Sequence, residues 1–224
     1  SQIRHWGLSR GNYIVAISRI VHHKGLGYLV DAYKRLSTDK KLVIVGDGAF
    51  TDGYVAKLKA QAADNANIIF TGNVSGMACA SAAGAVWPGT ALAQLYENAC
   101  IFVQPSESEG LSLSLLEAMA RRKAVLVSSI RENTEAIATT GYIFENKNVA
   151  DLSAKLEYML SRPGEIAEKG EAAHERIVAF FNWDVIARDI ASVYESATSG
   201  VRTNSFYIRH FSTIKKFSDI LPLF

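Results

Sequence analysis

The sequence has 224 residues, 49% of them hydrophobic and 21% charged, and carries a formal net charge of +2. This composition is typical of a globular protein and excludes a fibrous or largely disordered chain, and the length suits one α/β domain with a full core. The small net charge gives no case for nucleic-acid binding, and two cysteines are too few for a disulfide framework.

Short apolar, β-branched segments alternate with longer amphipathic segments along the chain. Six segments are expected to be strands: residues 13–17, 41–45, 67–70, 101–104, 124–128 and 141–144. Five are expected to be helices: residues 25–36, 54–63, 91–98, 111–121 and 149–160. Because parallel strands need a crossover, which is usually a helix, the alternation predicts an α/β fold with a doubly wound parallel sheet, Rossmann-like in type.

Two segments do not follow this alternation of strands and helices. Residues 76–90 form an insert rich in Ala, Gly and Ser inside the expected domain, residues 1–199. The most apolar stretch, residues 77–95, is interrupted by Pro, Gly and polar residues, so no membrane-spanning segment is expected. Residues 200–224 form a tail with several aromatic residues and four basic residues against one acidic. The tail either contacts an anionic membrane surface peripherally or stays disordered. With no leader peptide at the start of the sequence, we expect a cytoplasmic location with optional membrane association.

Glu109 and Glu117 give the strongest local signal, because they follow an expected strand, where doubly wound sheets bind ligands. If the seven residues between them were all helical, the carboxylates would lie roughly 12 Å apart. Carboxylates suit sugar hydroxyls, while Gly110 and the amides of residues 111–114, including Leu111 and Ser112, suit phosphates. The spacing therefore fits a glycosyl diphosphate. The alternative is a helix-capping Glu109 and a solvated Glu117.

Arg19 and Lys24 flank the loop after the first expected strand. An Arg binds phosphate oxygens in a bidentate fork and a Lys acts as a point charge, so the two suit a diphosphate, although solvation of both is the alternative. His22 and His23 lack the spacing partners of a metal site and are interpreted as loop residues. Without an Asp-x-Asp pair, we expect neither metal nor cofactor, and charge neutralisation falls to Arg19 and Lys24.

Three familiar signatures of other enzymes do not occur in the sequence. Neither Gly-x-Gly-x-x-Gly nor a P-loop is present, which counts against a dinucleotide dehydrogenase and a P-loop NTPase. No Ser or Cys lies in a nucleophile elbow, so a hydrolase triad has no starting residue.

These segments resemble the C-terminal, donor-binding domain of the retaining glycosyltransferases with the GT-B architecture, known as family 4 or glycosyl transferases group 1. The resemblance covers residues 7–197 and includes Arg-x4-Lys-Gly from Arg19, Glu-x7-Glu from Glu109 and the closing helix at residues 181–197. It implies metal-independent transfer of a hexosyl group, with retention, from a nucleoside diphosphate sugar to an acceptor hydroxyl. The setting implied is polysaccharide or glycoconjugate biosynthesis.

The resemblance also implies a role for each site residue. Arg19 and Lys24 bind the donor diphosphate and form the catalytic set with Glu109, which also binds the sugar hydroxyls. Glu117 binds the ribose. The loop of Gly72, Asn73 and Val74 lies near the base. The acceptor, a glycan or lipid-linked glycan, binds an N-terminal domain that this sequence lacks, so we expect little or no turnover by the isolated chain.

The sequence departs from the family pattern after Glu117. Arg122 stands where a turn glycine is usual, and Ser129 and Thr134 stand where Asp and Pro are common. Two other functions therefore stay open. One is a non-catalytic module that binds a nucleotide sugar or a partner, with residues 121–134 altered by loss of catalysis. The other is one half of a nucleotide-sugar epimerase.

Overall fold

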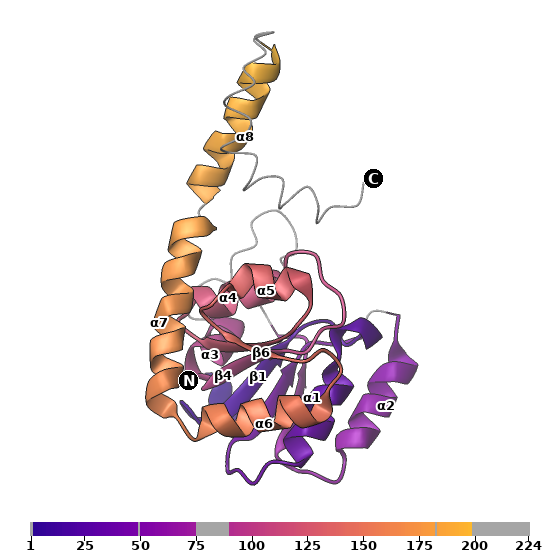
Figure 1. The fold of residues 1–224 in the computed structure, drawn as a ribbon. Coiled ribbons are helices and arrows are strands. Elements are labelled where there is room, and N and C mark those ends of the chain that lie inside the picture. Colours follow the sequence, from indigo (N-terminus) through magenta and orange to yellow (C-terminus); the bar gives the residue numbers. More distant parts are fainter. Residues whose placement is uncertain (1, 49, 75–89, 182, 199–224) are drawn as a thin grey trace. The chain divides into compact units, whose positions relative to one another are not determined.

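The computed structural model describes residues 2–48, 50–74, 90–181 and 183–198 (Figure 1). The expected tail at 200–224, and all of the expected insert except Thr90, lie outside the described residues. The chain divides into two compact units, Ser1–Glu175 and Arg176–Phe224, and each is considered by itself. The domain boundary expected after residue 199 stays a prediction.

The centre of the first unit is a parallel sheet made of the six expected strands. They are β1 (Tyr13–Ile17), β2 (Lys41–Val45), β3 (Ile68–Gly72), β4 (Ile101–Gln104), β5 (Ala124–Ser128) and β6 (Tyr142–Phe144). Their order is β3-β2-β1-β4-β5-β6, and every neighbouring pair is parallel, which confirms the doubly wound, Rossmann-like fold. The strand order reverses between β1 and β4. This switch point is where open α/β sheets bind ligands.

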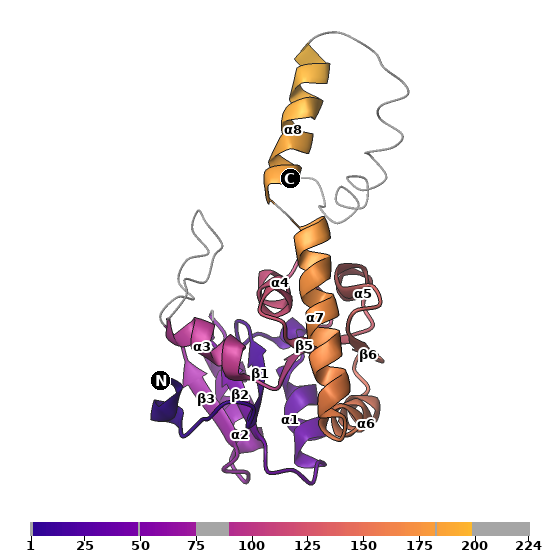
Figure 2. The same cartoon turned by 90° about the vertical axis from the view of Figure 1, so that its left-hand side faces the viewer.

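Helices cover both faces of the sheet. One face carries α1 (Leu26–Lys34), α2 (Asp52–Ala62) and α6 (Val149–Leu160), and the other carries α3 (Ala91–Asn98), α4 (Leu113–Ala120) and α5 (Arg131–Ile137). Figures 1 and 2 show α1 and α6 below the sheet and α4 and α5 above it. The remaining elements are η1 (Gln2–Trp6), η2 (His22–Lys24), α7 (Pro163–Phe180) and α8 (Trp183–Thr198). None of the helices within the described ranges combines the length and apolar composition that crossing a bilayer requires.

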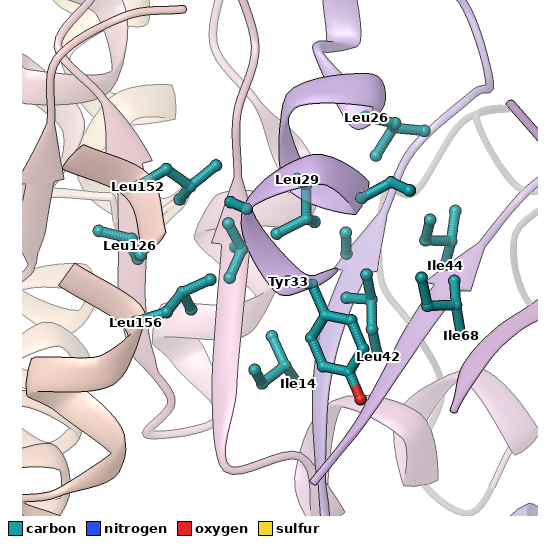
Figure 3. Packing of buried hydrophobic residues seen from close by; sticks show 14 of the residues in the cluster. Ile14, Leu26, Leu29, Tyr33, Leu42, Ile44, Ile68, Leu126, Leu152 and Leu156 are labelled. Carbon is teal, nitrogen blue, oxygen red and sulfur yellow. The ribbon is translucent and has the colours of Figure 1, made fainter. Parts of the chain in front are cut away.

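A cluster of buried hydrophobic residues lies between the sheet and the helices α1, α2 and α6. Leu29 of α1 and Leu152 and Leu156 of α6 are fully buried there, with Ile14 and Leu126 of the sheet (Figure 3). Each such side chain contributes about 1.5–3 kcal/mol of hydrophobic free energy. Strands buried on both faces require near-continuous apolar sequence, which is why the strands could be predicted.

The helices were predicted less completely than the strands. The expected helix at residues 111–121 begins only at Leu113, because the hydroxyl of Ser112 caps it by accepting from the amide of Leu115. Two helices, α5 and α7, were not expected. The first has no side-chain cap at its start, and the second mixes charged residues with small and apolar ones along its length, although Pro163 at its first position is a typical start signal.

Candidate functional site

The loops that follow β1 and β4 meet at the switch point of the sheet. Gly25 has a φ of 65°, in the left-handed region, and a Cβ atom added to it would lie 2.0 Å from the carbonyl oxygen of Pro105. The amide of Glu107 donates to the carbonyl oxygen of His23 at 2.7 Å. Only glycine permits this approach, so the Lys24-Gly25 step of the sequence is a requirement for the two loops to pack together.

Lys24 and Glu109 form an ion pair across this contact. The ammonium nitrogen of Lys24 lies 2.7 Å from both carboxylate oxygens of Glu109, and the two side chains are 15% and 8% exposed. The hydroxyl of Ser106 also donates to Oε1 of Glu109, at 2.6 Å. Two residues of the expected site, which lie far apart in the sequence, are therefore in direct contact. Charge-assisted hydrogen bonds of this kind fix the carboxylate more firmly than neutral ones.

Arg19 occupies the same loop but is exposed, and its side chain has no partner among the described residues. Its backbone is nevertheless held. The amide of Ile20 donates to the carbonyl oxygen of Asp47 at 2.8 Å, and the hydroxyl of Thr51 donates to the carbonyl oxygen of Ile20 at 2.8 Å. The loop after β1 is thus tied to the loop after β2 as well. Arg19 is a cation with a fixed backbone and a side chain open to a ligand.

The loop after β4 runs from Glu109 into the start of α4. Gly110 and Leu111 precede the helix, and an added Cβ at Gly110 would meet nothing within 4 Å. The space beside this backbone is therefore open. Ser112 is 9% exposed, and its hydroxyl is committed within the protein, to Gln104 and to the cap. A ligand can reach the backbone here more readily than the Ser112 side chain.

Glu117 lies in the second turn of α4 and pairs with Arg121, one turn further on. Arg121 also donates to the carbonyl oxygen of Glu117 at 3.3 Å, and its guanidinium lies 5.5 Å from the ring centre of the buried Tyr96. The i, i+4 spacing of the pair is visible in the sequence, where Arg121 stands out only as the first residue of the segment that departs from the family pattern. The carboxylate expected to bind ribose therefore already has a cationic partner.

Gly72, Asn73 and Val74 lie two strands away from the switch point, at the end of β3. Gly72 has a φ of 68°, and its carbonyl oxygen accepts from the amide of Gly46 at 3.1 Å. Asn73 is exposed and Val74 is buried. The expected contact of this loop with a base stays a prediction.

One cluster at this edge was missed by the sequence analysis. Lys147, in the loop after β6, lies 2.7 Å from Oε2 of Glu107, and the hydroxyl of Tyr28 donates to Oε1 of Glu107 at 2.8 Å. The Lys147 contact, followed by that of Tyr28, holds the pKa of Glu107 below its ordinary value, and Glu107 raises the pKa of Lys147. The sequence could have indicated this cluster, because residues 145–148 follow an expected strand, as the other candidate loops do.

The departures from the family pattern have visible consequences. Arg122 has a φ of 56°, a left-handed conformation that favours glycine, and a Cβ on Gly170 of α7 would lie 2.3 Å from its carbonyl oxygen. Ser129 accepts from the amide of Asn146 at 3.0 Å. Thr134 bonds its hydroxyl to the carbonyl oxygen of Arg131. Each substitution is accommodated without breaking the end of β5.

In the described ranges of the chain, no group of three or more His, Cys, Asp or Glu side chains is arranged to hold a metal ion. The His22 ring instead packs at a tilt against the Tyr54 ring, with ring centres 4.0 Å apart, and the carbonyl oxygen of His23 accepts from the amide of Glu107. The two histidines therefore serve contacts between loops. The expectation of metal-independent chemistry stays a prediction.

The fold and the site together define a Rossmann-like domain with a cationic loop and an acidic loop meeting at its switch point. A family model described as glycosyl transferases group 1 matches residues 11–162, which is more than half of the sequence. The chain therefore belongs to the glycosyl transferases group 1 family.

A curated relative and two solved structures show how much of a longer protein the chain represents. It is 29% identical over 199 residues to the MMP alpha-(1->4)-mannosyltransferase of Mycolicibacterium hassiacum, covering 87% of this chain and 45% of that one. The fold matches that of Anabaena HepE in complex with UDP and glucose with a TM-score of 0.75 and 19% identity, covering 87% of this chain and 51% of that one. It also matches the C-terminal domain of the group 1 protein LpcC from Francisella tularensis, with a TM-score of 0.62 and 23% identity, over 81% and 92% of the chains.

The chain thus spans about half the length, or less, of the curated relatives that it matches. Its fold is that of the C-terminal half of the GT-B architecture.

Proposed function

We propose that this chain is the donor-binding half of a retaining hexosyltransferase, which transfers a sugar from a nucleoside diphosphate sugar to an acceptor hydroxyl. The observation that supports it most is the meeting of Lys24 and Glu109 at the switch point, where a ligand of this fold is expected. The chain's membership of the family and the UDP-bound fold neighbour agree with this proposal.

In the proposed complex, Arg19 and Lys24 neutralise the diphosphate. The guanidinium of Arg19 is exposed and has no partner in the part of the chain that the structure describes. Lys24 can turn from Glu109 toward a phosphate because its ammonium has three donors. When the bond between the sugar carbon and the phosphate oxygen breaks, these cations stabilise the leaving phosphate. The acceptor hydroxyl then forms the new glycosidic bond on the same face of the sugar and gives its proton to the leaving phosphate. We propose no metal for this step.

At the other end of the donor, Glu109 accepts from the sugar hydroxyls and Glu117 from the ribose. Glu117 must share its oxygens with Arg121, which holds the carboxylate in place for a diol. The acceptor, a glycan or a lipid-linked glycan, requires the N-terminal half of the GT-B architecture. Closing two domains over the donor excludes water and aligns the acceptor, so this chain alone is expected to bind the donor but not to turn it over.

Calorimetric titration of the chain with UDP, GDP and ADP tests the donor site. We expect one of them to bind, and Arg19→Ala and Lys24→Met each to weaken binding about tenfold or more, because each removes a charge-assisted phosphate contact. Lys34→Ala is the matched control, because it removes a cation from α1 that pairs with Asp64 outside the site. If no nucleotide binds, the chain is an interaction module instead.

Two observations favour the second candidate, a non-catalytic module. The carboxylate of Glu117 is paired within its own helix, and Arg122 holds a strained turn where the family has glycine. A module of this kind keeps nucleotide binding but has no use for the ribose contact. Glu117→Ala then leaves nucleotide affinity unchanged, whereas the transferase proposal expects it to fall.

A further inference from the structure

Buried polar side chains form a continuous hydrogen-bonded network beneath the loop that carries Glu109. Its members are Gln104, Ser106, Ser112, Ser128 and Asn133, and they are at most 9% exposed. They come from the ends of β4 and β5, from the loop between β4 and α4, and from the first turn of α5. Burying a polar group is costly unless it is hydrogen-bonded. A network in which each of these side chains has a partner is therefore a specific arrangement and not a packing accident.

The network holds both ends of the loop. At the far end, the hydroxyl of Ser112 donates to Oε1 of Gln104 at 2.6 Å, and Nε2 of Gln104 donates to Oδ1 of Asn133 at 2.6 Å. Asn133 then donates through Nδ2 to the hydroxyl of Ser128 at 3.0 Å. At the near end, the hydroxyl of Ser128 donates to the carbonyl oxygen of Ser106. Residues 106 and 112 are thereby anchored to the same buried asparagine.

Ser106 carries this anchoring into the site. Its carbonyl oxygen is fixed by Ser128, and its own hydroxyl donates to Oε1 of Glu109 at 2.6 Å. Lys24 donates to both oxygens of the same carboxylate. An ionised carboxylate has about four lone-pair positions, so Oε1 is filled by these two donors and Oε2 keeps one position for a ligand.

We propose that Ser106, supported by Ser128 and Asn133, is the positioning residue that aims Oε2 of Glu109 at the sugar of the donor. The inference rests on the proposed function, in which Glu109 binds the sugar hydroxyls. Lys24 alone cannot fix the carboxylate, because its flexible stem follows the phosphate once a donor binds. The Ser106 hydroxyl stays in place in both states.

The test compares the affinity for a nucleoside diphosphate with that for its glucose and mannose conjugates. The ratio of the two dissociation constants isolates the contribution of the sugar. We expect Ser106→Ala to reduce that contribution about tenfold while the affinity for the nucleoside diphosphate stays within about twofold of the unaltered chain. Ser128→Ala, which keeps the Ser106 hydroxyl but frees its carbonyl, should reduce the contribution less.

Ser129→Ala is the matched control, because among the described residues that hydroxyl is hydrogen-bonded to the amide of Asn146 in the next loop and not to the network. Thermal unfolding of every variant shows that it is folded. The inference is overturned if Ser106→Ala retains the full sugar contribution, or if it weakens the diphosphate and its conjugates equally. Failure of the proposed function looks different. In that case the unaltered chain binds no nucleotide, or gives the same sugar contribution as Glu109→Ala.

Discussion

Two pairs of opposite charge mark the two ends of the proposed donor site, and they are built differently. Lys24 and Glu109 are 85 positions apart in the sequence and come from loops after different strands. Glu117 and Arg121 are four positions apart on one helix. The first pair exists only when the sheet has assembled, whereas the second needs no more than one helical turn.

The two pairs also differ in whether a ligand can draw the cation away from its carboxylate. Lys24 belongs to the loop opposite Glu109, so a phosphate can draw it away while Ser106 keeps the carboxylate in place. Arg121 contacts both the side chain and the carbonyl oxygen of Glu117 and lies over Tyr96. It therefore remains beside its carboxylate. The end of the site that binds the sugar depends on tertiary packing, and the ribose end depends on local sequence.

Gly25→Ala disrupts the packing between the two loops that carry Lys24 and Glu109. Of the substitutions considered, we expect it to have the largest effect on stability. The new methyl group would overlap the Pro105 carbonyl, and a φ of 65° strains any residue with a Cβ. Together these effects should lower the free energy of unfolding by about 3 kcal/mol. Urea denaturation measures the loss.

Gly27→Ala is the control for that substitution. Its Cβ would lie 3.4 Å from the Gln61 side chain, and alanine favours the helix. We expect Gly27→Ala to be neutral or slightly stabilising. An equal loss in both variants would mean that the contact between the loops is not the cause.

Double-mutant cycles compare the two pairs directly. We expect a coupling energy of about 1.5 kcal/mol between Lys24 and Glu109, using Lys24→Met and Glu109→Gln, because the pair is largely buried and has two short hydrogen bonds. For Arg121→Met and Glu117→Gln we expect about 0.5 kcal/mol, the value of a pair within one helix. Urea denaturation of the single and double variants gives both numbers. Equal coupling energies would remove the distinction between a tertiary and a local pair.

Arg122→Gly tests the backbone conformation at the end of α4, directly after the local pair of Glu117 and Arg121. The substitution relieves the left-handed conformation at the end of α4, and the greater flexibility of glycine in the unfolded chain offsets part of the gain. We expect a net stabilisation of about 0.5 kcal/mol, measured as a shift of the urea midpoint. Glu171→Ala removes the exposed ion pair of Arg122 without altering its backbone, and should have almost no effect. A destabilised glycine variant would show that Arg122 is held by its contacts and not strained.

The sequence was sufficient for the sheet, and it named Lys24 and Glu109, which the structure brings into contact. Buried parallel strands need apolar residues on both faces, so their positions stand out, and ligand loops follow them by topology. Lys24 and Glu109 could be named from the types of residue in two such loops. Their contact with each other could not be predicted, because it depends on the approach of Gly25 to Pro105.

The buried network shows a second reason for what was missed. Gln104, Ser128 and Asn133 are ordinary polar residues in the sequence, and nothing in their spacing indicates that they are buried. Only the packing of α5 against β5 turns them toward one another. Arg121 was missed for the opposite reason, since its spacing from Glu117 was visible but was not interpreted.

A third pair, Glu107 with Lys147, separates the effect of distance in the sequence from that of burial. It joins loops that are far apart in the chain, as Lys24 and Glu109 do, but its lysine is exposed.

Because the Lys147 contact and then the Tyr28 hydrogen bond lower the pKa of Glu107 from its ordinary 4.5, the ionised form stabilises the folded state. That stabilisation is complete above about pH 4.5 and is lost as the pH falls through the lowered pKa. We therefore expect the urea midpoints of Glu107→Gln and the unaltered chain to differ most above pH 5 and to converge as the pH falls through the lowered pKa of Glu107. Lys147→Met should converge in the same way, since it removes the other partner, and a difference that does not change with pH would mean that the pair adds nothing in solution.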